Sequence, residues 1–290
     1  MPQLDKLMQA SVKDEATAAE LARRVAAKRN IPPHDPEAVC AAEAYPLERV
    51  WPRHLLDLLP WRDLLKVRTR LCYAFRIRKN RLLRLTRTCM CSAQASKSSK
   101  ARAALEGGDA PPPAYVLSRL PRVADPSGGE AAAKALALLV PLLRLSAAPS
   151  SVDDEWLQTH LALPPAIKAE LLRRFTESAA EAPVQRGSTP QPARGARYSR
   201  PKPKVDLLRA YILVLALHVD GFSLDWSDLA TELRVDKAAL IKPIMELGCK
   251  IKGSGGQPRR AVLMPDAAEG QTLTSFLPDT TTRPTAAKRR

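Results

Sequence analysis

Residues 206–264 constrain the fold of this chain most, because ordered elements and their boundary residues alternate there at short intervals. The run after Asp206 is apolar nearly all round, which is typical of a helix that contacts neighbours on several sides. Gly221 supplies the left-handed residue that ends such a helix. Asp206, Asp225 and Asp236 each stand where a carboxylate can cap a helix. We therefore predict three helices, over residues 207–219, over 226–233 and from 237 onward.

Two short strands with a glycine-rich tip follow the third helix. Residues 250–252 alternate in polarity as a half-buried strand does, and residues 261–264 form the predicted return strand. Residues 253–256, Gly-Ser-Gly-Gly, form the tip between them. The order helix, extended link, helix, turn, helix, strand, tip, strand is that of the winged-helix variant of the helix-turn-helix.

In that motif the third helix offers its exposed face to the major groove, and basic groups on the wing meet phosphates. We expect Lys237 and Lys242 to face outward on the third helix. Pro243 lies inside the same helix, where it removes a backbone donor and crowds the preceding turn. We therefore expect a kink or an early end there, and contact with phosphates more than with bases.

The upstream part of the chain repeats this plan. Helical patterns over residues 130–145, from 152 onward and over 166–175 precede a basic, Pro- and Gly-rich piece, as if three helices led into a second wing. We predict a mainly α fold with small β wings, a tandem winged helix. The predicted divisions are a flexible or adaptor segment (1–44), a first winged helix (45–185) with a low-complexity insert near 92–113, a basic linker (186–205), a second winged helix (206–266) and a flexible basic tail (267–290).

The charge of the chain indicates a polyanionic partner. The net charge is +16 and the sequence pI is about 10.0. Residues 66–102 hold twelve basic and no acidic residues, and residues 186–204 hold six basic and no acidic ones. A membrane surface is the weaker alternative, because aromatic residues are only 4%. No apolar run reaches the roughly 18 residues of a membrane span.

Patterns for catalysis or metal binding are missing from the sequence. The five cysteines include Cys89 and Cys91, which lack the spacing and the second pair of a zinc site. No phosphate-binding G-x-x-x-x-G-K-[ST] pattern is present. His218 lies on the apolar helix at 207–219, where a core or capping role is expected. We expect a protein that is not an enzyme and needs no cofactor or metal.

Residues 210–251, AYILVLALHVDGFSLDWSDLATELRVDKAALIKPIMELGCKI, resemble a known family. The family is that of the forty-nine-kilodalton subunit, or polymerase-associated factor, of RNA polymerase I, in its C-terminal tandem winged-helix region. Residues 45–48 and 161–177 resemble other parts of that region in the same order. The resemblance implies a non-catalytic subunit of the nuclear and nucleolar polymerase that transcribes ribosomal RNA genes, which binds DNA and supports initiation and elongation.

The family normally carries an N-terminal β-barrel that forms a heterodimer with a second small subunit. Residues 1–44 are too short and too polar for such a barrel, which argues against the heterodimer here. Either the gene model is truncated, or that function is absent or belongs to another chain.

We therefore expect DNA and the core subunits of RNA polymerase I as partners, with no membrane. DNA contact should be through phosphates and largely independent of sequence. Two alternatives stay open, a winged-helix module that docks on proteins and a nucleolar RNA-binding protein. The expected DNA contacts are Lys237, Lys242, Lys250, Lys252, Arg259, Arg260, Arg200, Lys202 and Lys204.

Overall fold

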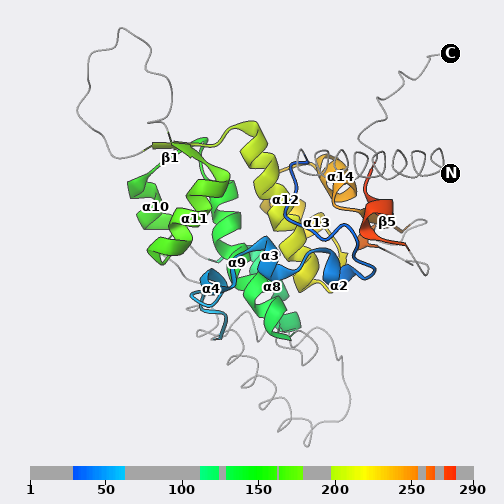
Figure 1. Cartoon of the computed structure of the whole chain (residues 1–290). Helices are drawn as coiled ribbons and strands as arrows, with labels where there is room; N and C mark the ends of the chain where they lie inside the picture. Colours follow the sequence, from blue (N-terminus) through cyan, green and yellow to red (C-terminus); the bar gives the residue numbers. More distant parts are fainter. Residues whose placement is uncertain are drawn as a thin grey trace, which may run out of the picture.

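The computed structural model describes residues 29–62, 112–123, 129–161, 163–178, 197–253, 259–264 and 271–278. These residues form mainly helices with two small antiparallel sheets of three strands each (Figure 1). This confirms the predicted fold class, mainly α with small β wings. Several predicted features lie wholly or largely outside the described residues, namely the basic block at 66–102, the insert near 92–113, residues 186–196 of the linker and the wing tip.

The second winged-helix unit has the predicted order of elements. It consists of α12 (Lys202–Val219), β4 (Ser223–Leu224), α13 (Ser227–Glu232), α14 (Lys237–Glu246), β5 (Cys249–Lys252) and β6 (Arg260–Leu263). Its sheet has the order β4-β6-β5, so β6 lies in the centre. As predicted, Asp236 caps α14, because its Oδ1 accepts from the Ala238 amide at 3.2 Å.

Helix α12 begins earlier than the sequence predicted. We expected Asp206 to cap it, but the helix starts at Lys202 after Pro201. Pro203 lies in the first turn, where proline loses no intrahelical hydrogen bond. The helix therefore takes in residues 202–205, which we had assigned to the linker.

The first winged-helix unit repeats the second element for element. It consists of α9 (Gly129–Ala147), β1 (Ser151–Asp153), α10 (Asp154–His160), α11 (Pro165–Phe175), β2 (Glu177–Ser178) and β3 (Arg197–Ser199). Its sheet order, β1-β3-β2, matches that of the second unit. The central strand β3 lies inside the segment that we predicted as a linker (186–205). Its residue Tyr198 pairs with Val152 on β1 and with Ser178 on β2. The other predicted domain boundaries stay predictions.

The first helices of the two units share one core. α9 packs along α12 in the middle of the molecule, with α10 and α11 to one side and α13 and α14 to the other (Figure 1). Leu136, Leu139 and Leu142 on α9 and Ile212 and Leu215 on α12 are fully buried. The two units therefore form one hydrophobic core rather than two separate ones. Within the described residues, no helix is both long and apolar enough to span a bilayer.

The described parts of the two terminal segments, which we predicted as a flexible or adaptor segment (1–44) and a flexible basic tail (267–290), pack on this core. In the described part of the first segment, Ala38 and Ala44 are buried. In the described part of the second, α15 (Leu273–Phe276) buries Leu273. The two segments hydrogen-bond to each other, with the Leu273 amide donating to the Ala38 carbonyl at 2.9 Å. Three short helices, α2 (Ala41–Ala44), α3 (Leu47–Val50) and α4 (Arg53–Leu56), continue from the first segment.

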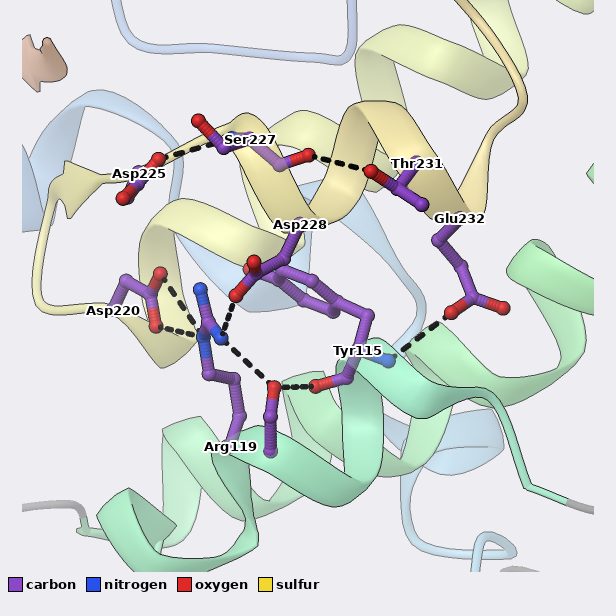
Figure 2. Close-up of polar contacts among 9 residues, drawn as sticks. Tyr115, Arg119, Asp220, Asp225, Ser227, Asp228, Thr231 and Glu232 are labelled. Atoms are coloured by element: carbon purple, nitrogen blue, oxygen red, sulfur yellow. Dashed lines mark hydrogen bonds and ion pairs between the residues drawn. The ribbon is translucent and has the colours of Figure 1, made fainter. Parts of the chain in front are cut away.

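Helix α8 (Ala114–Val123) ties the second unit to the rest of the molecule (Figure 2). Arg119 on α8 donates from Nε to Asp220 Oδ1 at 3.1 Å and from Nη1 to Asp228 Oδ2 at 2.7 Å. Burial alone would lower the pKa of Arg119, but its hydrogen bond to Asp228 and the charge of Asp220 outweigh burial and raise that pKa above its ordinary value. The Tyr115 amide also donates to Glu232 on α13, so α8 holds both ends of α13.

Candidate nucleic-acid interface

The wing of the second unit, formed by β5 and β6, presents a basic outer face. Lys250 and Lys252 are exposed at alternate positions of β5, and Arg260 is exposed on β6. Lys252 lies directly opposite Arg260 in the sheet. Like charges opposite each other destabilise a strand pair, whereas an anion between them would remove that repulsion. This arrangement is suited to binding a phosphate.

Three cations of this wing lack a carboxylate partner among the described residues. Within the described part of the chain, none of Lys250, Arg259 and Arg260 forms an ion pair with a carboxylate. Lys250 contacts a ring instead, with its Nζ 4.7 Å from the centroid of Phe276 on α15. We define the basic wing as Lys250, Lys252, Arg259 and Arg260.

The exposed face of α14 is less basic than the wing. Lys237 and Lys242 face outward as predicted. Lys242 Nζ lies 3.8 Å from Oε1 of Glu246, which is one turn further along the helix. The remaining exposed residues of this face are Ala238, Ala239 and Met245, of which Met245 is 50% exposed. Such side chains offer no hydrogen bonds to base edges.

Pro243 does not end α14. The helix continues to Glu246, and the Leu247 amide donates to the Pro243 carbonyl at 3.2 Å. The predicted early end of the helix at Pro243 is therefore wrong. Leu240 and Ile244, on either side of the proline, are buried and keep the helix against the core.

Two predicted contacts, Arg200 and Lys204, act inside the protein. The Arg200 guanidinium donates to the carbonyls of Leu145, Ala148 and Pro149 at the end of α9, and burial lowers its pKa. Lys204 Nζ donates to the Arg174 carbonyl at the end of α11, at 2.9 Å. Cations at the C-terminal ends of helices satisfy carbonyls that the helix leaves free. Lys202, by contrast, is exposed.

The third helix of the first unit, α11, carries cations that are already paired. Lys168 Nζ lies 3.7 Å from Asp154 Oδ1. The guanidinium groups of Arg173 and Arg174 both donate to the Glu170 carboxylate. The hydrogen bond from Arg173, followed by that from Arg174, lowers the pKa of Glu170 to about 2. The two units thus share a fold, but the cations of α11 are paired, whereas Lys250, Arg259 and Arg260 on the second unit form no ion pair among the described residues.

Sequence patterns missed Phe276, which lies beneath Lys250 in the segment predicted as a tail. The spacing of Leu273, Phe276 and Leu277 at i, i+3 and i+4 is a helical signal, but three positions are too few to stand out.

His218 has the expected core role, since its Nε2 lies 2.7 Å from the Tyr45 carbonyl and burial lowers its pKa.

These observations define a class of protein, a tandem winged-helix scaffold with a basic wing on its second unit. Among the residues described, no cluster of three His, Cys, Asp or Glu side chains could hold a metal ion. The profile of one protein family, the A49-like RNA polymerase I associated factors, matches residues 85–276, more than half of the chain. The chain belongs to this family, which confirms the resemblance found in the sequence. No curated protein matches the chain.

Family membership sets the broad role of the protein. It is a non-catalytic factor associated with RNA polymerase I, and it acts in transcription. Membership also implies a nuclear protein.

Proposed function

We propose that this chain binds DNA by its phosphates while associated with RNA polymerase I, and so supports initiation and elongation on ribosomal RNA genes in the nucleolus. The observation that carries the proposal is the basic wing, where Lys252 lies opposite Arg260 and where none of Lys250, Arg259 and Arg260 forms an ion pair with a carboxylate among the described residues. Each phosphate that a cation neutralises releases counterions, so such a wing supplies affinity without reading sequence.

The proposed contacts fall into two groups. The basic wing supplies the main contacts, and Lys237, Lys242 and Lys202 supply further ones from exposed positions. Arg200 and Lys204 are left out of this set, because helix-end carbonyls occupy their head groups. Ala238 and Ala239 on α14 offer no hydrogen bonds to base edges, which supports binding that is largely independent of sequence.

The exposed face of α14 favours a second candidate function, docking on a protein. Met245 is one of three large hydrophobic residues that are exposed within the described part of the chain. Together with Ala238 and Ala239 it gives α14 a small apolar surface, with Lys237 beside it. Under this alternative α14 contacts the polymerase, and the basic wing is free to contact DNA or not.

Charge reversal separates the two functions. The double variant Lys250→Glu/Lys252→Glu should lose DNA binding in a fluorescence-anisotropy titration and still co-purify with RNA polymerase I. Met245→Glu should keep DNA binding, and it should lose the polymerase only if α14 is the docking surface. Loss of polymerase association with unchanged DNA binding in the double variant would contradict the proposal and favour docking by the wing.

A matched control tests whether loss of any lysine has the same effect. Lys204→Gln removes one positive charge from the same unit, but that ammonium donates to the Arg174 carbonyl. We expect it to leave the salt dependence of DNA binding unchanged. Lys202→Gln, two residues away at an exposed position, should reduce the slope by about 0.9 if Lys202 neutralises a phosphate.

A further inference from the structure

The ring of Phe276 supports one lysine of the basic wing. Lys250 Nζ lies over this ring, 4.7 Å from its centroid, and Phe276 itself is half-buried. An ammonium group over an aromatic face is attracted by the ring quadrupole. In the described chain no carboxylate pairs with Lys250, so this ring is the contact that orients its head group.

The segment that carries the ring is itself held firmly. We call residues 271–278 the C-terminal strap. α15 is only four residues long, and a helix of that length is not stable alone. Leu273 and Leu277 anchor the strap in the core, and a Cβ placed on Gly248 would come within 2.9 Å of Leu273 Cδ1. The strap therefore packs directly on Gly248, the residue immediately before β5.

The N-terminal segment fixes the strap from its other side. Thr274 donates from its amide and from Oγ1 to the Pro36 carbonyl, at 3.2 and 2.7 Å. Arg29 Nη2 donates to the Pro278 carbonyl at 2.8 Å. These bonds join the two terminal segments of the described chain beside the wing, so Phe276 has a fixed position relative to β5.

We propose that Phe276 is a positioning residue for DNA binding, which holds the ammonium of Lys250 in place on the outer face of the wing before DNA arrives. This inference rests on the proposed function. A free lysine loses rotamer freedom when it meets a phosphate, and a side chain that is already oriented loses less. The ring stays beneath the ammonium, while the opposite side of the ammonium remains open to a phosphate oxygen.

The proposal predicts a specific effect on affinity. Phe276→Leu keeps an apolar side chain against the strap but removes the ring. It should weaken DNA binding about two- to tenfold at low salt, the range expected when one flexible side chain must be ordered on binding. The salt slope should not change, because Lys250 still carries its charge to the same phosphate. Phe276→Tyr keeps the ring and should restore the affinity of the original chain.

A double-mutant cycle with Lys250→Gln tests the proposal in the full chain, using a short duplex DNA as the probe and thermal unfolding to verify each variant. Lys250→Gln alone should reduce the salt slope by about 0.9. In its background, Phe276→Leu should have no further effect, because the ammonium that the ring positions is gone.

The outcomes separate the inference from the function. If Phe276→Leu weakens binding equally in both backgrounds, the ring acts through the fold and the inference is overturned. If Phe276→Leu has no effect while Lys250→Gln lowers the slope, the inference alone fails and DNA binding by the wing stands. If Lys250→Gln changes neither affinity nor slope, the wing contact itself fails, and the proposed function with it.

Discussion

Arg119→Met should destabilise the protein strongly, because it leaves a buried carboxylate without its guanidinium partner. The Arg119 side chain is 8% exposed and that of Asp220 is 1% exposed, with 3.1 Å between Nε and Oδ1. Breaking a buried pair of this kind costs about 3–5 kcal/mol. Methionine keeps an unbranched apolar side chain but removes the guanidinium, and with it the contact of Cζ with the Tyr115 ring at 4.6 Å, so the loss includes this contact as well as the ion pair. The free energy of unfolding, measured in urea by circular dichroism, should fall by this amount.

Two controls locate the effect. Asp228→Asn removes the other partner of Arg119, but the Asp228 side chain is 60% exposed, so we expect a loss of only about 0–1 kcal/mol. Arg119→Met combined with Asp220→Asn should cost much less than the sum of the single changes, since the buried charge of Asp220 is removed together with its guanidinium partner. A loss below about 1 kcal/mol for Arg119→Met would refute the role of α8 as a clamp on the second unit.

Two further predictions concern local geometry and pH. Gly221→Ala and Gly248→Ala both place a side chain at positive φ, +65° and +83°, which costs about 1–2 kcal/mol. Of the two, only Gly248→Ala would bring its new Cβ against Leu273, at 2.9 Å. Gly248→Ala should therefore lower the free energy of unfolding more than Gly221→Ala does. Equal losses would contradict the packing of the strap on Gly248. Glu170→Gln should destabilise by about 1–3 kcal/mol at neutral pH. Folding lowers the pKa of Glu170 from 4.5 to about 2, so the difference in unfolding free energy between the original chain and Glu170→Gln should disappear as the pH falls through that range. Urea titrations at pH 7 and pH 2.5 measure this difference. The same difference at both pH values would contradict the role of the ionised carboxylate.

The second winged helix was predictable because its signals are local. Asp236 caps α14 through the amide two residues on, and Gly221 ends α12 through its own backbone conformation. The outward positions of Lys250 and Lys252 follow from the alternation of a single strand. No distant contact is needed for any of these features.

The features that the sequence did not predict depend on distant contacts. β3 has three residues, too few to show a period, and it exists because Tyr198 pairs with Val152 and Ser178. Residues 32–38 look polar and proline-rich in the sequence, yet the carbonyls of Pro36 and Ala38 accept hydrogen bonds from the strap. Arg200 and Lys204 resemble free surface cations in the sequence, and only the folded chain places helix-end carbonyls beside them.

The salt dependence of DNA binding tests the central claim most directly. The four residues of the basic wing, Lys250, Lys252, Arg259 and Arg260, are changed together to Gln, and the slope of log K against log salt is compared with that of the original chain. If each neutralises one phosphate, the slope should decrease by about 3.6, at about 0.9 for each contact. An unchanged slope, with the variant still folded, would contradict the claim that this wing is the DNA contact.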